Sequence, residues 1–420
     1  MTATRFPLSR RHLLSSLGAL AAWPALAESD AASELWAQIR AQWLVGPRLA
    51  YFDTAGFAPT LRAVLVAQYR AQEALNTDPE AFFHSRYAAQ PVQELCTRLA
   101  SWLDCAPDEL CCVSNANTGL QQVADELTLQ PGDEVIVAEQ LPAELLAYWR
   151  HQATQRQLLL KTLRLPMPLT REQAINTVSQ AMSERTRVLC LSHVQPLDGA
   201  ILPIQELCNL AQQRNVYTLI EGALSFGALN FSVRQLNCDA YATSLCHWLN
   251  GAAPTGLVYV RRDVQTQWPA NIAPVLPPGL SLQGWPALQQ RWPLALIEQA
   301  AQWQSVSAAL SLQLNLGRDV IQRRLQQLQT YARLNLQSNT GIELLTPTEP
   351  GACLHILSLR ATNHAPSDLA DWLARNDNVI VGAINNATTQ DTALRISLHH
   401  CNSLDEIDRL TLGLQRALRA

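Results

Sequence analysis

Short apolar segments that alternate with helical ones constrain the fold of this chain most. Such alternation, with helices of roughly 10–15 residues between buried strands, is typical of a parallel sheet covered by helices on both faces. The chain has 420 residues, of which 48% are hydrophobic, so it can bury a large core. We expect strands at 134–138, 157–163, 187–193 and 216–221, and helices at 142–153, 170–183 and 203–214. The sequence therefore predicts an α/β fold.

The pattern changes after Arg262. A proline-rich stretch is followed by two long helical segments near 287–314 and 317–338. The remainder mixes expected strands with helices, which indicates a smaller α+β domain. We therefore expect an N-terminal helical segment at 28–49, a large domain at 50–285 and a small C-terminal domain at 286–420.

The first 27 residues read as a twin-arginine signal peptide. Arg10 and Arg11 precede an apolar run, and Ala25-Leu26-Ala27 fits a small-x-small cleavage site. The run is too short for a permanent membrane span, and no other stretch approaches the roughly 18 apolar residues that a span needs. These features predict a periplasmic protein that is exported already folded.

Charge and cysteine spacing exclude several classes of site. The net charge of −4 gives no reason to expect binding to nucleic acid or to an anionic membrane. The ten cysteines form no Cys-x-x-Cys pair and no Cys/His group with zinc spacing, so we expect buried free thiols and no metal site. Lys and Arg total 31, of which one is lysine, Lys161. Any mechanism that needs a lysine has this single candidate.

Six segments are informative through their order and spacing: Tyr51–Pro59, Ser114–Leu120, Ser192–Ile204, Glu221–Ala223, Ser244–Gly251 and Leu394–Ser397. Together they resemble the class V aminotransferase family of fold-type I pyridoxal-phosphate (PLP) enzymes, which includes isopenicillin N epimerases and cysteine desulfurases. The family also has twin-arginine-exported members that tailor siderophores. The resemblance implies a mostly parallel sheet flanked by helices, a smaller α+β domain, and a homodimer.

The resemblance places His247 where the family carries the lysine that binds PLP covalently. Cys246 stands where the family has His, and Ser244 opens the same motif as a cofactor-binding candidate. Lys161 lies in an expected peripheral strand, far in the sequence from these segments. No covalent bond between PLP and a lysine is therefore expected.

At other positions that the resemblance assigns to cofactor binding, the residue is either kept or altered relative to the family. Glu221 replaces the family's Asp, either to contact the ring nitrogen of PLP or to cap a strand end. Asn117 and Thr118 either bind the phosphate or cap a helix. Leu141 stands near the family's stacking aromatic.

Two further residues have alternative roles. Arg395 either binds a carboxylate or forms an ordinary ion pair. His193 follows an apolar strand, where it either serves the site or packs in the core.

Three hypotheses follow. The first is a catalytically degenerate family member, which acts as a binding or partner subunit for an amino-acid-like ligand or an active paralogue. The second is a rewired enzyme that acts on an amino-acid or siderophore-peptide substrate, with PLP held non-covalently and His247 as acid/base. The third is an enzyme without PLP on the same fold. The sequence contains no Gly-x-Ser-x-Gly motif that would support this hypothesis.

Overall fold

The computed structural model describes residues 30–86, 89–269, 282–293, 295, 298–385 and 391–419. The predicted signal peptide, 1–27, lies outside the described residues. No described helix is both long and apolar enough to cross a membrane.

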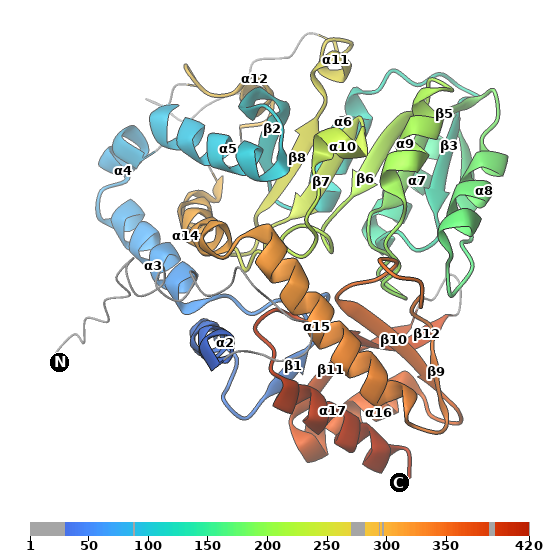
Figure 1. Cartoon of the computed structure of the whole chain (residues 1–420). Helices are drawn as coiled ribbons and strands as arrows, with labels where there is room; N and C mark the ends of the chain where they lie inside the picture. The colour runs from blue at the N-terminus through green and yellow to red at the C-terminus, as the bar shows by residue number, and fades with distance from the viewer. Residues whose placement is uncertain are drawn as a thin grey trace.

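A seven-stranded sheet forms the centre of the large part of the molecule (Figure 1). Strands β3 to β7 run parallel, whereas β8 is antiparallel to both of its neighbours, β7 and β2. Strands β3 and β8 are completely buried, and so is β5 apart from Arg187, as their largely apolar sequences predict. In sheet order the strands are β2 (Leu110–Val113), β8 (Gly256–Val260), β7 (Ala240–Ser244), β6 (Tyr217–Glu221), β5 (Thr186–Ser192), β3 (Glu134–Ala138) and β4 (Leu159–Leu163).

Helices cover this sheet, and side-chain caps fix where several of them begin. The Thr170 side chain accepts a hydrogen bond from the amide of Gln173 at the start of α8, and Asn115 caps α6 in the same way. The helices of this part are α3 (Arg62–Thr77), α4 (Pro79–Arg86), α5 (Ala89–Leu103), η1 (Pro107–Glu109), α6 (Ala116–Glu126), α7 (Ala143–Gln155), α8 (Arg171–Ala181), α9 (Ile204–Gln212), α10 (Val233–Leu236), α11 (Arg262–Gln265), α12 (Ala287–Arg291) and α14 (Ala300–Leu316).

A second sheet of five strands forms the smaller part, and the long helix α15 (Arg318–Gln337) runs from one part to the other (Figure 1). In the hydrophobic core of this smaller part, Leu328 and Leu357 pack in one cluster with Phe52, which comes from near the N-terminus. The strands, in sheet order, are β1 (Ala50–Phe52), β11 (Val379–Asn385), β12 (Thr392–Ser397), β10 (Ile356–Ala361) and β9 (Ile342–Leu344); the helices are α2 (Asp30–Gln42), α16 (Pro366–Asp377) and α17 (Leu404–Ala417).

The expected fold class is confirmed, and two element boundaries were wrong. The long helix predicted over 287–314 is divided, because α12 ends at Arg291 and α14 begins only at Ala300, with Pro293 between them. The strand expected from Gln157 begins at Leu159, since Gln157 adopts a left-handed conformation with φ 54°. The domain limits at 49 and 285 remain predictions.

Candidate functional site

The carboxyl ends of three neighbouring strands bring the predicted residues of the large part to one edge of the sheet. Ser192 ends β5 and is followed by His193, Glu221 ends β6 and Ser244 ends β7. Ligands of open α/β sheets bind at this edge. The first turn of α6 lies beside Ser244, whose Oγ accepts a hydrogen bond from the Ala116 amide at 3.1 Å.

Glu221 is buried, and each of its carboxylate oxygens accepts one hydrogen bond inside the protein. Its Oε2 accepts from Ser192 Oγ at 3.0 Å and its Oε1 accepts from the Ala223 amide at 2.7 Å. Burial raises the pKa of the Glu221 carboxyl, and the two hydrogen bonds oppose that rise. The carboxyl therefore links the end of β6 to the end of β5 and to the turn that follows β6. Each oxygen keeps a lone pair for a further donor.

His193 is held by a chain of hydroxyl groups that starts on β7. Its Nδ1 lies 3.2 Å from the Tyr241 hydroxyl, which in turn contacts Ser225 Oγ. Because Ser225 donates to the Gly222 carbonyl at 2.9 Å, it accepts from Tyr241, and Tyr241 accepts from His193. Burial lowers the pKa of His193 to about 4, so the imidazole is neutral at pH 7, with Nε2 as its acceptor.

His247 lies on the turn after β7 and contacts the segment that follows β1. Its Nδ1 lies 3.0 Å from the Thr54 carbonyl, and a carbonyl accepts, so Nδ1 carries the proton. Burial lowers the pKa of His247, and this hydrogen bond raises it in part. The neutral ring therefore presents Nε2 as an acceptor.

Arg395 on β12 already has a carboxylate partner within the chain. Its Nη2 lies 3.1 Å from Asp53 Oδ1, and its Nη1 donates to the Pro196 carbonyl at 3.2 Å. The Arg395 side chain is only 8% exposed. A ligand carboxylate must share this guanidinium with Asp53 or displace Asp53 from it.

The structure thus brings Glu221, His193, Ser244, Asn117 and Thr118 to the large sheet and its helix α6. His247 and Arg395 meet around the segment Asp53–Thr54: His247 contacts the Thr54 carbonyl and Arg395 contacts Asp53. The charge of Arg395 lowers the pKa of His247, and the charge of Asp53 raises it. Sequence reasoning missed the partners Asp53, Thr54 and Tyr241. Asp53 and Thr54 lie within a segment of the resemblance, but nothing in the sequence paired them with residues about 190 and 340 positions away.

Lys161 lies on the edge strand β4, far from this group. Its Nζ donates to the Ala181 carbonyl at 2.7 Å, at the end of α8. Cations commonly satisfy the last carbonyls of a helix in this way. The hydrogen bond gives Lys161 a structural role at the sheet edge.

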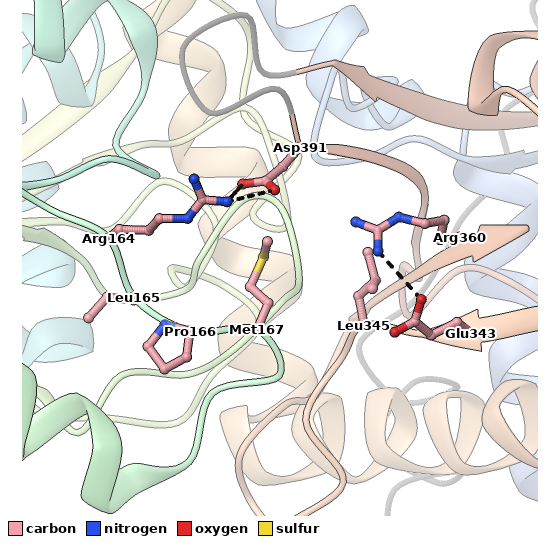
Figure 2. A pocket seen from close by; sticks show the side chains of 8 residues that line it. All are labelled: Arg164, Leu165, Pro166, Met167, Glu343, Leu345, Arg360 and Asp391. Carbon is pink, nitrogen blue, oxygen red and sulfur yellow. Dashed lines mark hydrogen bonds and ion pairs between the residues drawn. The ribbon is translucent and has the colours of Figure 1, made fainter.

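A cavity of about 380 Å³ lies between the loop after β4 and the small sheet, as Figure 2 shows. Arg164 pairs with Asp391 on one wall and Arg360 pairs with Glu343 on the other, with Met167 between them. These arginines are mostly exposed, and no predicted site residue lines the cavity. It therefore adds nothing to the site at the sheet edge.

Three consecutive buried side chains, His399, His400 and Cys401, bring their ligand atoms within 4.8 Å of one another, a proximity that sequence spacing did not suggest. The Cys401 amide donates to His399 Nδ1 at 3.2 Å, which occupies one ligand atom. The positive charge of Arg324 lowers the pKa of His400 further than burial alone. A neighbouring cation also opposes a metal ion, so packing explains this cluster better than metal binding.

Comparisons with known proteins agree with this architecture. A family model described as aminotransferase class-V matches residues 50–410. Isopenicillin N epimerase of Amycolatopsis lactamdurans is 26% identical over 405 residues, which cover 90% of this chain and 98% of that protein. A cysteine desulfurase of Serratia proteamaculans is 25% identical over 387 residues, which cover 88% of this chain and 94% of that protein.

Solved structures show the same fold at lower identity. A C-DES mutant with glycine covalently linked to its PLP cofactor superposes with a TM-score of 0.80 at 19% identity, covering 90% of this chain and 98% of that chain. The cysteine desulfurase CsdA of Escherichia coli gives a TM-score of 0.76 at 21% identity, covering 91% and 98%.

Proposed function

We propose that this chain, which belongs to the class V aminotransferase family, is a catalytically degenerate member that serves as a binding or partner subunit. The observation that carries the proposal is the position of its single lysine. Three strands, β3, β5 and β6, separate β4 with Lys161 from β7, which leads to His247. At about 4.8 Å between neighbouring strands, this is about 19 Å of sheet. A lysine side chain cannot cross that distance.

The residues at the sheet edge do not fit PLP in the way the resemblance implies. Glu221 can still meet the ring nitrogen, because each of its oxygens accepts only one hydrogen bond, from Ser192 or from Ala223, so the misfit lies at other residues. Leu141 supplies no flat face for stacking. Two first-turn amides of α6, those of Ala116 and Thr118, already have acceptors. We therefore derive no reaction step through this cofactor.

One observation favours a rewired enzyme as the second candidate. The Thr54 carbonyl fixes the tautomer of His247, and the lowered pKa keeps the ring neutral, so Nε2 is a proton acceptor at pH 7. In this candidate His247 moves a proton on an amino-acid or siderophore-peptide substrate, and PLP is held without a covalent bond.

An absorption spectrum of the purified protein, recorded with and without added PLP and after dialysis, separates the two candidates. The first predicts that no cofactor band survives dialysis. A band that survives in the wild type and vanishes in His247→Ala supports the rewired enzyme and contradicts the first candidate. Cys246→Ala, a change at the neighbouring position, is the matched control.

An exposed apolar face supports a homodimer. On α3, Leu65, Val66 and Tyr69 are 49%, 42% and 68% exposed, and Phe57, which precedes the helix, is 63% exposed. Exposed apolar groups of this kind mark interaction surfaces. Tyr69→Glu is expected to convert the dimer to monomers in analytical ultracentrifugation, whereas an unchanged mass argues against this face.

Export through the twin-arginine pathway to the periplasm remains part of the proposal, supported by Arg10, Arg11 and the cleavage pattern at Ala25–Ala27. Replacing both arginines by lysine is expected to retain the protein in the cytoplasm. Fractionation of cells that express either form tests this.

A further inference from the structure

A helix N-terminus binds phosphate when its first amides are free and a positive charge stands near them. The first turn of α6 is where the resemblance places the phosphate of PLP. The condition of this turn therefore bears on the ligand that the site accepts.

Two of its three amides are already used. The Ala116 amide donates to Ser244 Oγ at 3.1 Å, and the Thr118 amide donates to Asn115 Oδ1 at 2.9 Å. The Asn117 amide is the one donor of this turn that has no acceptor among the residues that the structure describes. A phosphate at this turn must compete with the side chain of Asn115.

Asn115 is held in place from two sides. A Cβ on Gly256 of β8 would lie 2.6 Å from the Asn115 Cα, so the two backbones touch directly. The preceding residue, Ser114, accepts from Gln299 Nε2 at 2.8 Å. Moving the cap away from the helix therefore disturbs β8 or the start of α14.

Charge at this turn does not favour an anion. The segments Ser114–Gly119 and Ser244–Gly251 contain no lysine or arginine. His247 is neutral at pH 7, because burial lowers its pKa. Glu221 adds a buried carboxyl at the neighbouring strand end. Within the segments Ser114–Gly119 and Ser244–Gly251, a phosphate would meet neutral donors only.

We infer that a phosphate group adds no affinity to a ligand of this site, an inference that rests on the proposed binding function. The hydrogen bond from Thr118 to Asn115 closes the turn that would otherwise hold the phosphate.

Pyridoxine and pyridoxine 5′-phosphate are suitable probes, because they differ only in the phosphate and have no aldehyde to react with Lys161. Calorimetric titration of the full chain is expected to give affinities for the two within about threefold. The variant Asn115→Ala, which releases the Thr118 amide, is expected to shift the preference toward the phosphorylated probe by about tenfold. Ser244→Ala, which releases the Ala116 amide, is a second variant in the same direction.

Ser403→Ala, which removes the cap of the distant helix α17, is the matched control and leaves the preference unchanged. The inference is overturned if the wild type binds pyridoxine 5′-phosphate more than about tenfold more tightly than pyridoxine. It is also overturned if neither Asn115→Ala nor Ser244→Ala shifts the preference toward the phosphorylated probe. Turnover of an amino acid by the wild type would refute the proposed function and leave this affinity ratio untouched.

Discussion

Arg395 Nη2 lies 3.1 Å from Asp53 Oδ1, so the arginine that the resemblance assigns to a substrate carboxylate already holds one from its own chain. Asp53 follows β1, and Arg395 lies on β12, which is separated from β1 by the strand β11 in the small sheet. The pair ties the segment beside His247 to that sheet.

Asp53→Asn removes the counter-charge of a guanidinium that is 8% exposed. We expect the free energy of unfolding to fall by about 1–3 kcal/mol, measured by urea denaturation. The control is Asp371→Asn, which breaks the exposed pair with Arg375 and is expected to cost less than about 0.5 kcal/mol. Equal losses of unfolding free energy in the two variants would show that the buried pair stabilises the fold no more than the exposed pair does.

Gly222 is required by the ring of Tyr241, because a Cβ at Gly222 would collide with the phenol. Gly222→Ala is expected to destabilise the protein by at least about 2 kcal/mol in thermal or urea unfolding. At Gly46 nothing lies within 4 Å of an added Cβ, so Gly46→Ala is the control and is expected to change stability by less than about 1 kcal/mol. Comparable effects would mean that β6 yields to admit the extra carbon.

The hydrogen-bonded chain from His193 through Tyr241 to Ser225 is expected to act as a unit. Tyr241→Phe, Ser225→Ala and the double variant form a mutant cycle. We expect a coupling energy of about 0.5–2 kcal/mol, because each single change leaves a buried partner unsatisfied. Strictly additive losses would contradict the chain.

Stability is expected to fall as pH drops from 7 to 5. Burial lowers the pKa of His193 to about 4 and that of His400 to about 3, so both stay neutral in the fold. Unfolded imidazoles take up protons below about pH 6.5, which costs about 1.4 kcal/mol per pH unit for each histidine. The stability that depends on these neutral histidines is fully present above about pH 6.5. It is lost as pH falls toward the folded pKa values.

Asp198 opposes this trend, because burial raises its pKa to about 6 and the fold then takes up a proton. Burial likewise raises the pKa values of Glu221 and Asp239. Five histidines have lowered pKa values, His193, His247, His355, His399 and His400, so the loss prevails. The variant His400→Gln is expected to reduce the slope of unfolding free energy against pH by about 1.4 kcal/mol per unit. An unchanged slope would show that His400 is protonated in the fold.

The sequence was a good guide to the strands and a poorer one to the contacts between distant segments. The continuous apolar runs of β3, β5 and β6 predicted buried parallel strands, because a strand covered on both faces needs no polar residues. The ends of β5 and β6 then placed His193 and Glu221 at one edge, whereas Ser244, at the end of β7, was indicated by the resemblance. Local periodicity could not show that Pro293 separates α12 from α14.

The partners of the site residues were beyond local reasoning. Asp53 meets Arg395 only because β1, from near the N-terminus, adds to the sheet of the C-terminal part. Tyr241 meets His193 because β7 and β5 flank β6 on its two sides, and a tyrosine in an apolar strand gives no sign of its partner. Such contacts depend on tertiary packing, which a single sequence does not specify.

The most direct test of the central claim is reduction with borohydride after incubation with PLP, followed by peptide mass spectrometry. The account predicts no stoichiometric PLP adduct in the folded protein, and the same result in Lys161→Gln. The variant His247→Lys is the positive control, because it places a lysine on the turn after β7. A stoichiometric adduct at Lys161 of the wild type would contradict the account.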